Sequence, residues 1–131
     1  MNKQGTLAVA FVAALAVPVA TAGPASASGG GDGVVRTGSC SGTTDWKLKA
    51  KHDNGRLEVE AEVDSNRNGQ TWNWAIRHNG SISARGQRVT QAPSGSFEVR
   101  RTLANFSGVD TIVFRARNVR SGEICRGVVR I

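Results

Sequence analysis

Apolar and polar residues alternate along most of the chain after Val34. The alternation has a period of two, and turn-forming residues interrupt it at intervals of about 8–12 residues. No stretch of this region shows the apolar spacing of a helix. The pattern predicts an all-β domain, a single antiparallel β-sandwich of about eight strands.

The segment 45–64 predicts one hairpin with a defined register. Its apolar positions alternate with Lys in the first half and with Glu in the second: Trp46, Leu48, Ala50, Leu57, Val59, Ala61 and Val63. Asn54-Gly55 is a preferred pair for a two-residue type I′ turn. This turn pairs Lys51 with Glu58 and Leu48 with Ala61, so charged and apolar positions agree on one register. The Lys/Glu ladder is therefore interpreted as a solvated face, not as a pair of catalytic carboxylates.

A second hairpin turns at His78-Asn79-Gly80. A three-residue loop over these residues keeps the faces consistent. It pairs Ile76 with Ile82, Trp74 with Ala84, and Trp72 with Gly86. Trp72 and Trp74 then share the face of Ile76 and are predicted in the core with Trp46. The alternative interpretation is an exposed platform for stacking a ligand.

The third hairpin turns over a four-residue loop, Val119–Gly122. Its inward pairs are Ala116 with Cys125, Phe114 with Gly127, and Ile112 with Val129. Its outward pairs are Arg115 with Arg126, Arg117 with Ile124, Val113 with Val128, and Thr111 with Arg130. Two further strands are predicted over 34–40 and 96–103. Arg101 shares the apolar phase of the latter, which indicates either a bulge or a position at the rim of a sheet.

The N-terminus has the features of a secretory signal peptide. Lys3 precedes an apolar run over 7–17, which is too short to span a bilayer. Small residues then favour cleavage after Ala27, with Ala22 as the alternative. Residues 28–33 are predicted to form a flexible Gly/Ser linker, and residues 34–131 the β-sandwich domain. We expect a secreted, extracellular protein without a membrane span, most simply a monomer.

Two Cys stand near the two ends of the expected domain. In an exported chain, Cys40 and Cys125 favour a disulfide over two buried free thiols, which is the alternative. The bond would tie the first strand to the last.

The chain is basic, with a formal net charge of +7, and most of its basic residues are Arg. An excess of Arg is typical of phosphate or sulfate recognition, but it also arises from the codon bias of a GC-rich genome. The outward face of the last hairpin is the candidate anion-binding site, formed by Arg115, Arg117, Arg126 and Arg130. Its alternative interpretation is ordinary solvated Arg whose stems cover apolar surface.

The stretch DTIVFRARN, 110–118, resembles the Asp-Thr-x-x-Tyr segment of immunoglobulin-like and fibronectin-type sandwiches. Phe114 replaces the corner Tyr of those families, and Ala116 stands where an antibody domain has its second Cys. The signal segment, Gly/Ser spacer and small β domain with one Cys pair also resemble small exported proteins of actinobacteria. This resemblance implies no particular activity.

Motifs for catalysis, cofactor binding and metal binding are absent from the sequence. His52 and His78 are both expected beside turns as solvated side chains. The stretch DSNRNG, 64–69, has one carboxylate and does not fit a calcium loop. We therefore expect a non-enzymatic protein without cofactor or metal that binds an anionic polymer or a cell-envelope surface. The alternatives are a carbohydrate-binding module and a secreted inhibitor or adhesin that presents the loop NRNGQ or QAPSGS.

Overall fold

The computed structural model describes residues 33–131, and these form eight strands. The expected signal peptide and all of the expected linker except Gly33 lie outside the described residues. Residues 33–131 include no helix with the length and apolarity to cross a membrane. The strands are β1 (Val34–Ser39), β2 (Asp45–Asp53), β3 (Arg56–Asp64), β4 (Thr71–His78), β5 (Ser81–Val89), β6 (Ser96–Ala104), β7 (Thr111–Asn118) and β8 (Ile124–Arg130).

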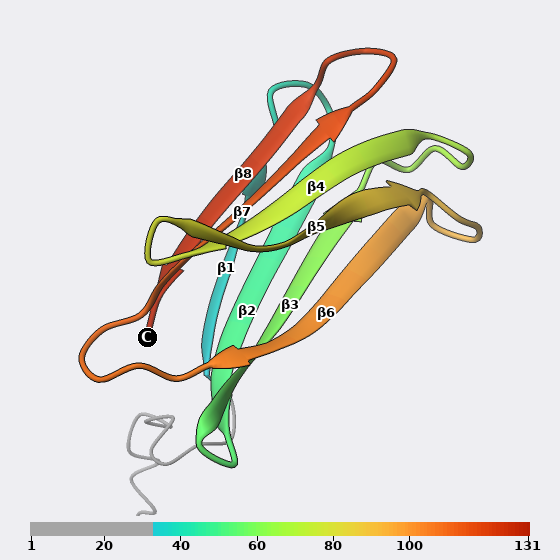
Figure 1. The fold of residues 1–131 in the computed structure, drawn as a ribbon. Helices are drawn as coiled ribbons and strands as arrows, with labels where there is room; N and C mark the ends of the chain where they lie inside the picture. Colours follow the sequence, from blue (N-terminus) through green and yellow to red (C-terminus); the bar gives the residue numbers. More distant parts are fainter. Residues whose placement is uncertain (1–32) are drawn as a thin grey trace, which may run out of the picture.

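The strands form two antiparallel four-stranded sheets that stack as the layers of a sandwich (Figure 1). One sheet has the order β1-β2-β3-β6, and the other has the order β5-β4-β7-β8. The chain leaves the first sheet after β3, forms β4 and β5 in the second, returns as β6 and ends with β7 and β8. Contacts between the layers place β8 beside β1 and β2, and β5 beside β6. The predicted all-β sandwich is confirmed.

The β2–β3 hairpin has the predicted register. Lys51 pairs with Glu58 and Leu48 with Ala61 across a turn in which Asn54 and Gly55 both have positive φ. The Lys51 ammonium lies 3.7 Å from a Glu58 carboxylate oxygen. The outward residues of both strands are charged, and the inward ones are apolar except His52 near the turn, which is exposed.

The predicted register of the β4–β5 hairpin is wrong. The turn contains two residues, Asn79 and Gly80, both with positive φ, and His78 belongs to β4, opposite Ser81. Ile76 pairs with Ala84, Trp74 with Gly86 and Trp72 with Arg88. A two-residue turn alone would mix the two faces of the hairpin. A β-bulge that leaves Ser83 without a partner restores the phase.

The β7–β8 hairpin has every predicted pair, including Ala116 with Cys125 and Arg115 with Arg126. The four-residue loop closes with the backbone N–H of Asn118 donating to the carbonyl of Glu123 at 2.8 Å. The predicted disulfide between Cys40 and Cys125 is also confirmed, and the described residues include no free Cys. It joins the end of the first strand to the last strand, across the edges of the two sheets.

The core lies between the sheets and includes two of the three Trp. Trp72 is 0% exposed and Trp74 is 4% exposed, which confirms their predicted core position. Trp46 is partly buried against the same cluster. The core contains these residues together with Leu48, Ala50, Leu57, Val59, Ala61, Val63, Ile76, Phe97, Val99, Leu103, Ile112, Phe114, Ala116, Cys125 and Val129.

Arg101 lies at the rim of a sheet and not at a bulge, and both positions were predicted as alternatives. The register between β3 and β6 is continuous through the pair Val59 and Arg101, so β6 has no bulge there. The Arg101 guanidinium carbon lies 5.0 Å from the centroid of the Trp74 ring. A cation over an indole face is attracted by the ring's quadrupole, so the Arg side chain covers this edge of the core.

The burial of Trp72 and Trp74 predicts a specific fluorescence result. In a Trp46→Phe variant, emission comes only from these two side chains, and their burial excludes a dissolved quencher. We expect a blue-shifted emission maximum and several-fold weaker quenching by acrylamide than for the free tryptophan amide. The variant measured in urea, where both indoles are exposed, is the matched control. Equal quenching in the folded and unfolded protein would contradict the buried position.

Candidate anion-binding face

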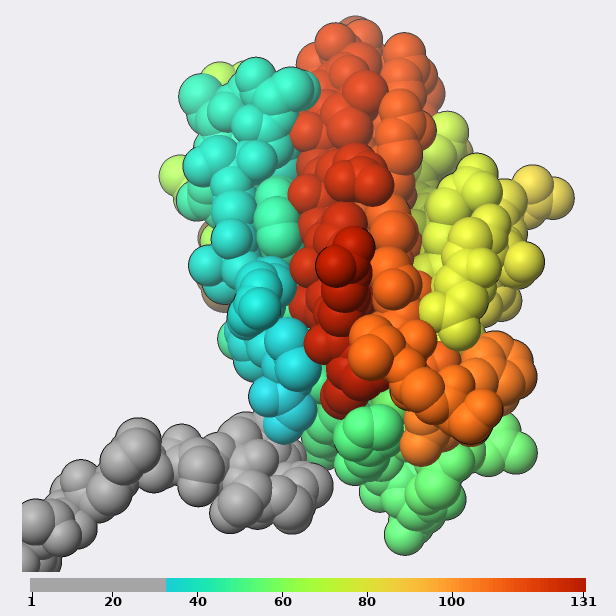
Figure 2. Space-filling model, turned by 90° about the vertical axis from the view of Figure 1, so that its left-hand side faces the viewer, coloured from blue at the N-terminus to red at the C-terminus, as the bar shows by residue number. Residues whose placement is uncertain are grey.

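The four sequence-predicted Arg lie on one exposed sheet face. Arg115 and Arg117 point outward from β7, and Arg126 and Arg130 from β8, because inward positions of both strands carry core residues. Arg115 and Arg126 are direct cross-strand partners. Figure 2 shows β8 and β7 side by side on this side of the molecule. The hairpin thus places four Arg side chains on one exposed face.

Two further Arg extend the surface onto the neighbouring strands. β4 lies against β7 so that Ala75 is opposite Arg115 and also opposite Arg85 of β5. A row across the whole sheet therefore runs Arg85, Ala75, Arg115, Arg126. Arg77 of β4 is exposed in the next row. We define the arginine face as the exposed residues Arg77, Arg85, Arg115, Arg117, Arg126 and Arg130.

The charges of the protein are segregated between the two sheets. The strands β5, β4, β7 and β8 contain seven Arg and no Asp, Glu or Lys. The seven are the six residues of the arginine face and Arg88. In β1, β2, β3 and β6, seven basic residues are balanced by seven acidic ones. Outside the strands, Arg67 and Arg120 offset Asp110 and Glu123 among the described residues. The net positive charge of residues 33–131 therefore resides on one sheet.

Protein carboxylates do not neutralise the arginine face. Within residues 33–131, ion pairs of Arg involve only Arg100, on the opposite sheet. There a hydrogen bond to Glu98 and the nearby carboxylates of Glu60 and Glu58 raise the pKa of Arg100 above its ordinary value. Of the four Arg in the strands of the opposite sheet, Arg100 is paired with carboxylates, whereas none of the seven Arg in the strands of this sheet has such a partner within residues 33–131.

Aliphatic side chains lie between the Arg of this face. Val113, Val128 and Ile124 occupy outward positions of β7 and β8, and each is partly buried. The methylene stems of neighbouring Arg can cover such positions while the guanidinium groups stay in water. The face therefore combines guanidinium groups with aliphatic side chains.

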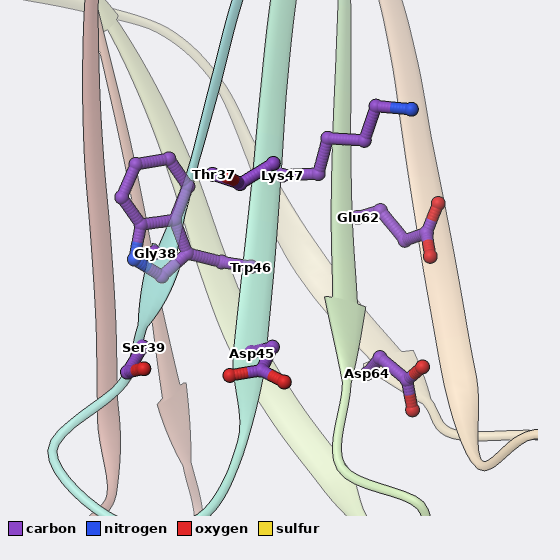
Figure 3. Close-up of a pocket in the computed structure, with 8 residues that line it drawn as sticks. All are labelled: Thr37, Gly38, Ser39, Asp45, Trp46, Lys47, Glu62 and Asp64. Atoms are coloured by element: carbon purple, nitrogen blue, oxygen red, sulfur yellow. The ribbon is translucent and has the colours of Figure 1, made fainter.

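A hollow on the other sheet holds acidic side chains and part of Trp46 (Figure 3). Asp45, Asp64 and Glu62 point outward there, and the indole extends to the β1 strand at Gly38. A Cβ atom at Gly38 would lie 2.7 Å from the Trp46 ring, and one at Gly127 2.5 Å from it. The indole is thus held between two glycines of opposite sheets, which explains its packing without a ligand.

The solvated position predicted for His78 is wrong, because this residue is buried. Its Nε2 lies 2.6 Å from Oδ1 of Asp110, which also accepts a hydrogen bond from Asn79 Nδ2 at 3.2 Å. The Phe106 ring stacks on the imidazole with centroids 4.9 Å apart. This cluster joins the β4–β5 turn to the start of β7.

The described residues contain no group of three or more His, Cys, Asp or Glu side chains placed to hold a metal ion. The guanidinium groups of the arginine face can make ionic and hydrogen-bonded contacts, and each of them can bind an oxyanion through two parallel N–H groups. Comparison of the chain with known protein families, with curated proteins and with solved structures found no match.

Proposed function

We propose that this protein is an exported, non-catalytic binding module whose arginine face holds an anionic polymer or the anionic surface of a cell envelope. The observation that carries the proposal is the segregation of charge. Seven Arg and no acid occupy the strands of one sheet, while the other sheet is balanced. The Cys40–Cys125 disulfide is compatible with an oxidising, extracellular compartment.

The arrangement of Arg115 and Arg126 supports this proposal energetically. Like charges directly opposite in a sheet destabilise the pair by about 0.2–1 kcal/mol. A ligand with repeated negative charges removes this repulsion when it binds. The relief of the repulsion then adds to the affinity for the ligand. At physiological ionic strength the Debye length is about 8 Å, so charges of the face act on a polymer mainly at contact distance.

An equal change of charge on either sheet tests the proposal. We expect Arg115→Ala/Arg126→Ala to weaken binding to heparin by about three- to thirty-fold at physiological salt, the sum of two exposed ion pairs. The dependence of affinity on salt should also become shallower, because fewer counterions are released. Binding is measured by titration calorimetry or by elution from a heparin column.

The matched control is Arg36→Ala/Arg56→Ala, which removes the same charge from exposed positions of the opposite sheet. The control is expected to bind heparin nearly as the parent does. Equal weakening by both double variants would show that only total charge matters. Unchanged binding by the Arg115/Arg126 variant would contradict a role for the face.

Stacking of a neutral carbohydrate on Trp72 and Trp74 has no support in their position, since both are buried. Ion pairing therefore supports a ligand of the arginine face better than aromatic stacking does.

A further inference from the structure

A polar cleft opens at one end of the sandwich, where the β3–β4 connection faces the β7–β8 turn. Its volume is about 490 Å³, within the range of about 300–1,000 Å³ that is common for small-molecule sites. The side chains that matter are Arg67, Asn68, Gln70, Asn118, Arg120 and Ser121. None of the residues that line the cleft is acidic.

The β3–β4 wall of the cleft is fixed by hydrogen bonds to Thr90. The Thr90 hydroxyl donates to the carbonyl of Arg67 at 2.5 Å and accepts from the backbone N–H of Gln70 at 2.9 Å. The backbone N–H of Gly69 donates to the carbonyl of Thr90 at 2.7 Å. The loop is therefore held in place before any ligand arrives.

The β7–β8 wall is fixed by Asn118 and is bonded to the other wall. Asn118 Oδ1 accepts from the backbone N–H groups of Arg120 at 2.9 Å and Ser121 at 3.0 Å. The backbone N–H of Val119 donates to the carbonyl of Thr71 at 3.0 Å, which links the two walls directly. A site built in this way loses little conformational entropy when it binds a ligand.

The floor of the cleft has unused hydrogen-bonding capacity. Asn118 is 2% exposed, and its Oδ1 accepts two backbone hydrogen bonds. The Oε1 atom of Gln70 is buried and has no hydrogen-bond partner among the described residues. Buried polar groups without partners are uncommon in folded proteins. A hydroxyl group can donate a hydrogen bond to this oxygen, so a hydroxylated ligand matches the unpaired acceptor.

The mouth of the cleft adds positive charge to this floor. Arg67 and Arg120 are both exposed and stand on opposite walls. The side chain of Arg117, a member of the arginine face, reaches the β7–β8 turn, where its Nη2 lies 3.5 Å from the position of a Cβ at Gly122. A polymer that lies along the arginine face can therefore continue past Arg117 into the cleft.

We propose that this cleft binds an acidic sugar, with the anionic group between Arg67 and Arg120 and the hydroxyl groups against Asn118 and Gln70. The inference rests on the proposed function, because it names the chemistry of the anionic polymer as an acidic polysaccharide. The anionic group of one sugar unit of this polysaccharide is a carboxylate, as in a uronic acid, or a phosphate, as in a phosphorylated sugar.

A nuclear magnetic resonance titration of the full domain tests the site with four small probes. We expect glucuronic acid, glucose 6-phosphate or both to shift the side-chain amide signals of Asn118 and Gln70. Glucose lacks the charge and inorganic phosphate lacks the sugar hydroxyls, so neither should produce these shifts. The acidic sugar that binds with the higher affinity identifies the anionic group as a carboxylate or a phosphate. Shifts of equal size with glucose or with inorganic phosphate alone, or no shift with any probe, would overturn the inference.

Variants separate this inference from the function of the arginine face. Arg67→Ala/Arg120→Ala should weaken binding of the acidic sugar about ten-fold, since each substitution removes one exposed ion pair with the ligand. Arg36→Ala/Arg56→Ala, with the same loss of charge, should leave it unchanged. If Arg115→Ala/Arg126→Ala loses heparin while no acidic sugar binds the cleft, this inference is overturned and the proposed function stands. If the cleft binds acidic sugars but the Arg115→Ala/Arg126→Ala variant still binds heparin, the proposed role of the arginine face is overturned and the proposed sugar site in the cleft is upheld.

Discussion

Replacement of both cysteines, Cys40→Ala/Cys125→Ala, lowers the free energy of unfolding by about 4–5 kcal/mol at 25 °C. The bond joins residues separated by 85 positions, and closing a loop of this length removes a comparable free energy from the unfolded chain. A domain of this size has a total stability of about 5–15 kcal/mol. The variant is therefore expected to be partly unfolded at 37 °C, and urea unfolding followed by Trp fluorescence measures the loss.

Hydrogen bonds around the disulfide hold the same two segments together when the sulfur atoms are removed. The Glu123 carboxylate accepts hydrogen bonds from the backbone N–H of Gly42 at 2.9 Å and of Thr44 at 3.0 Å, and from the Thr44 hydroxyl at 2.7 Å. The backbone N–H of Ser41 donates to the carbonyl of Ile124 at 2.8 Å. These bonds hold the segment after β1 against the start of β8 without the sulfur atoms. The native fold should therefore persist in the variant at low temperature.

The control is the parent protein under reducing conditions, which should match the stability of the double variant. A reducing agent should leave the variant itself unchanged. A loss below about 1 kcal/mol in both would mean that the disulfide removes little conformational entropy from the unfolded chain, and the chain-entropy argument would fail.

Short hairpins were the part of this fold that the sequence could predict. In β2–β3 and β7–β8, turn length and residue alternation are both local, so they fix the register together. The β4–β5 hairpin differs because its two-residue turn is combined with a bulge at Ser83, and turn length and alternation alone do not predict a bulge. The burial of His78 was not predictable either, because its partner Asp110 belongs to another hairpin.

The candidate site shows the same division between local and long-range structure. The pair Arg115 and Arg126 follows from one hairpin and was predicted. Arg77 and Arg85 join the face only because β4 lies against β7, an order that the alternation of residues does not determine. The absence of acids from four strands was visible in the sequence, but its meaning required knowing that these four strands form one sheet. The cleft requires two distant loops to meet and left no local signal.

Acid sensitivity of the Asp110 cluster is the second large effect that we expect. Asp110 is fully buried. Burial alone would raise the pKa of its carboxyl group, but hydrogen bonds from His78, Asn79 and the backbone of Phe106, with the interaction with the His78 charge, lower it below its ordinary value. A carboxyl group with a lowered pKa in the folded state contributes stability above its unfolded pKa of about 3.9. That contribution is lost as the pH falls through the folded value.

Asp110→Asn should therefore lower the free energy of unfolding by about 1.5–3 kcal/mol at pH 7, the range for hydrogen bonds to a charged group. The difference from the parent should shrink as the pH falls below about 4, because the carboxyl group of the unfolded parent then takes up a proton, and it should be lost as the pH falls through the lowered folded value. Asp53→Asn is the matched control, since Asp53 is exposed at the end of β2 and undergoes the same chemical change. Urea unfolding at pH 7 and at pH 3 measures both variants. If Asp110→Asn loses stability equally at the two values, the effect comes from altered packing and not from the carboxylate, and the His78–Asp110 pair would not be the source of acid sensitivity.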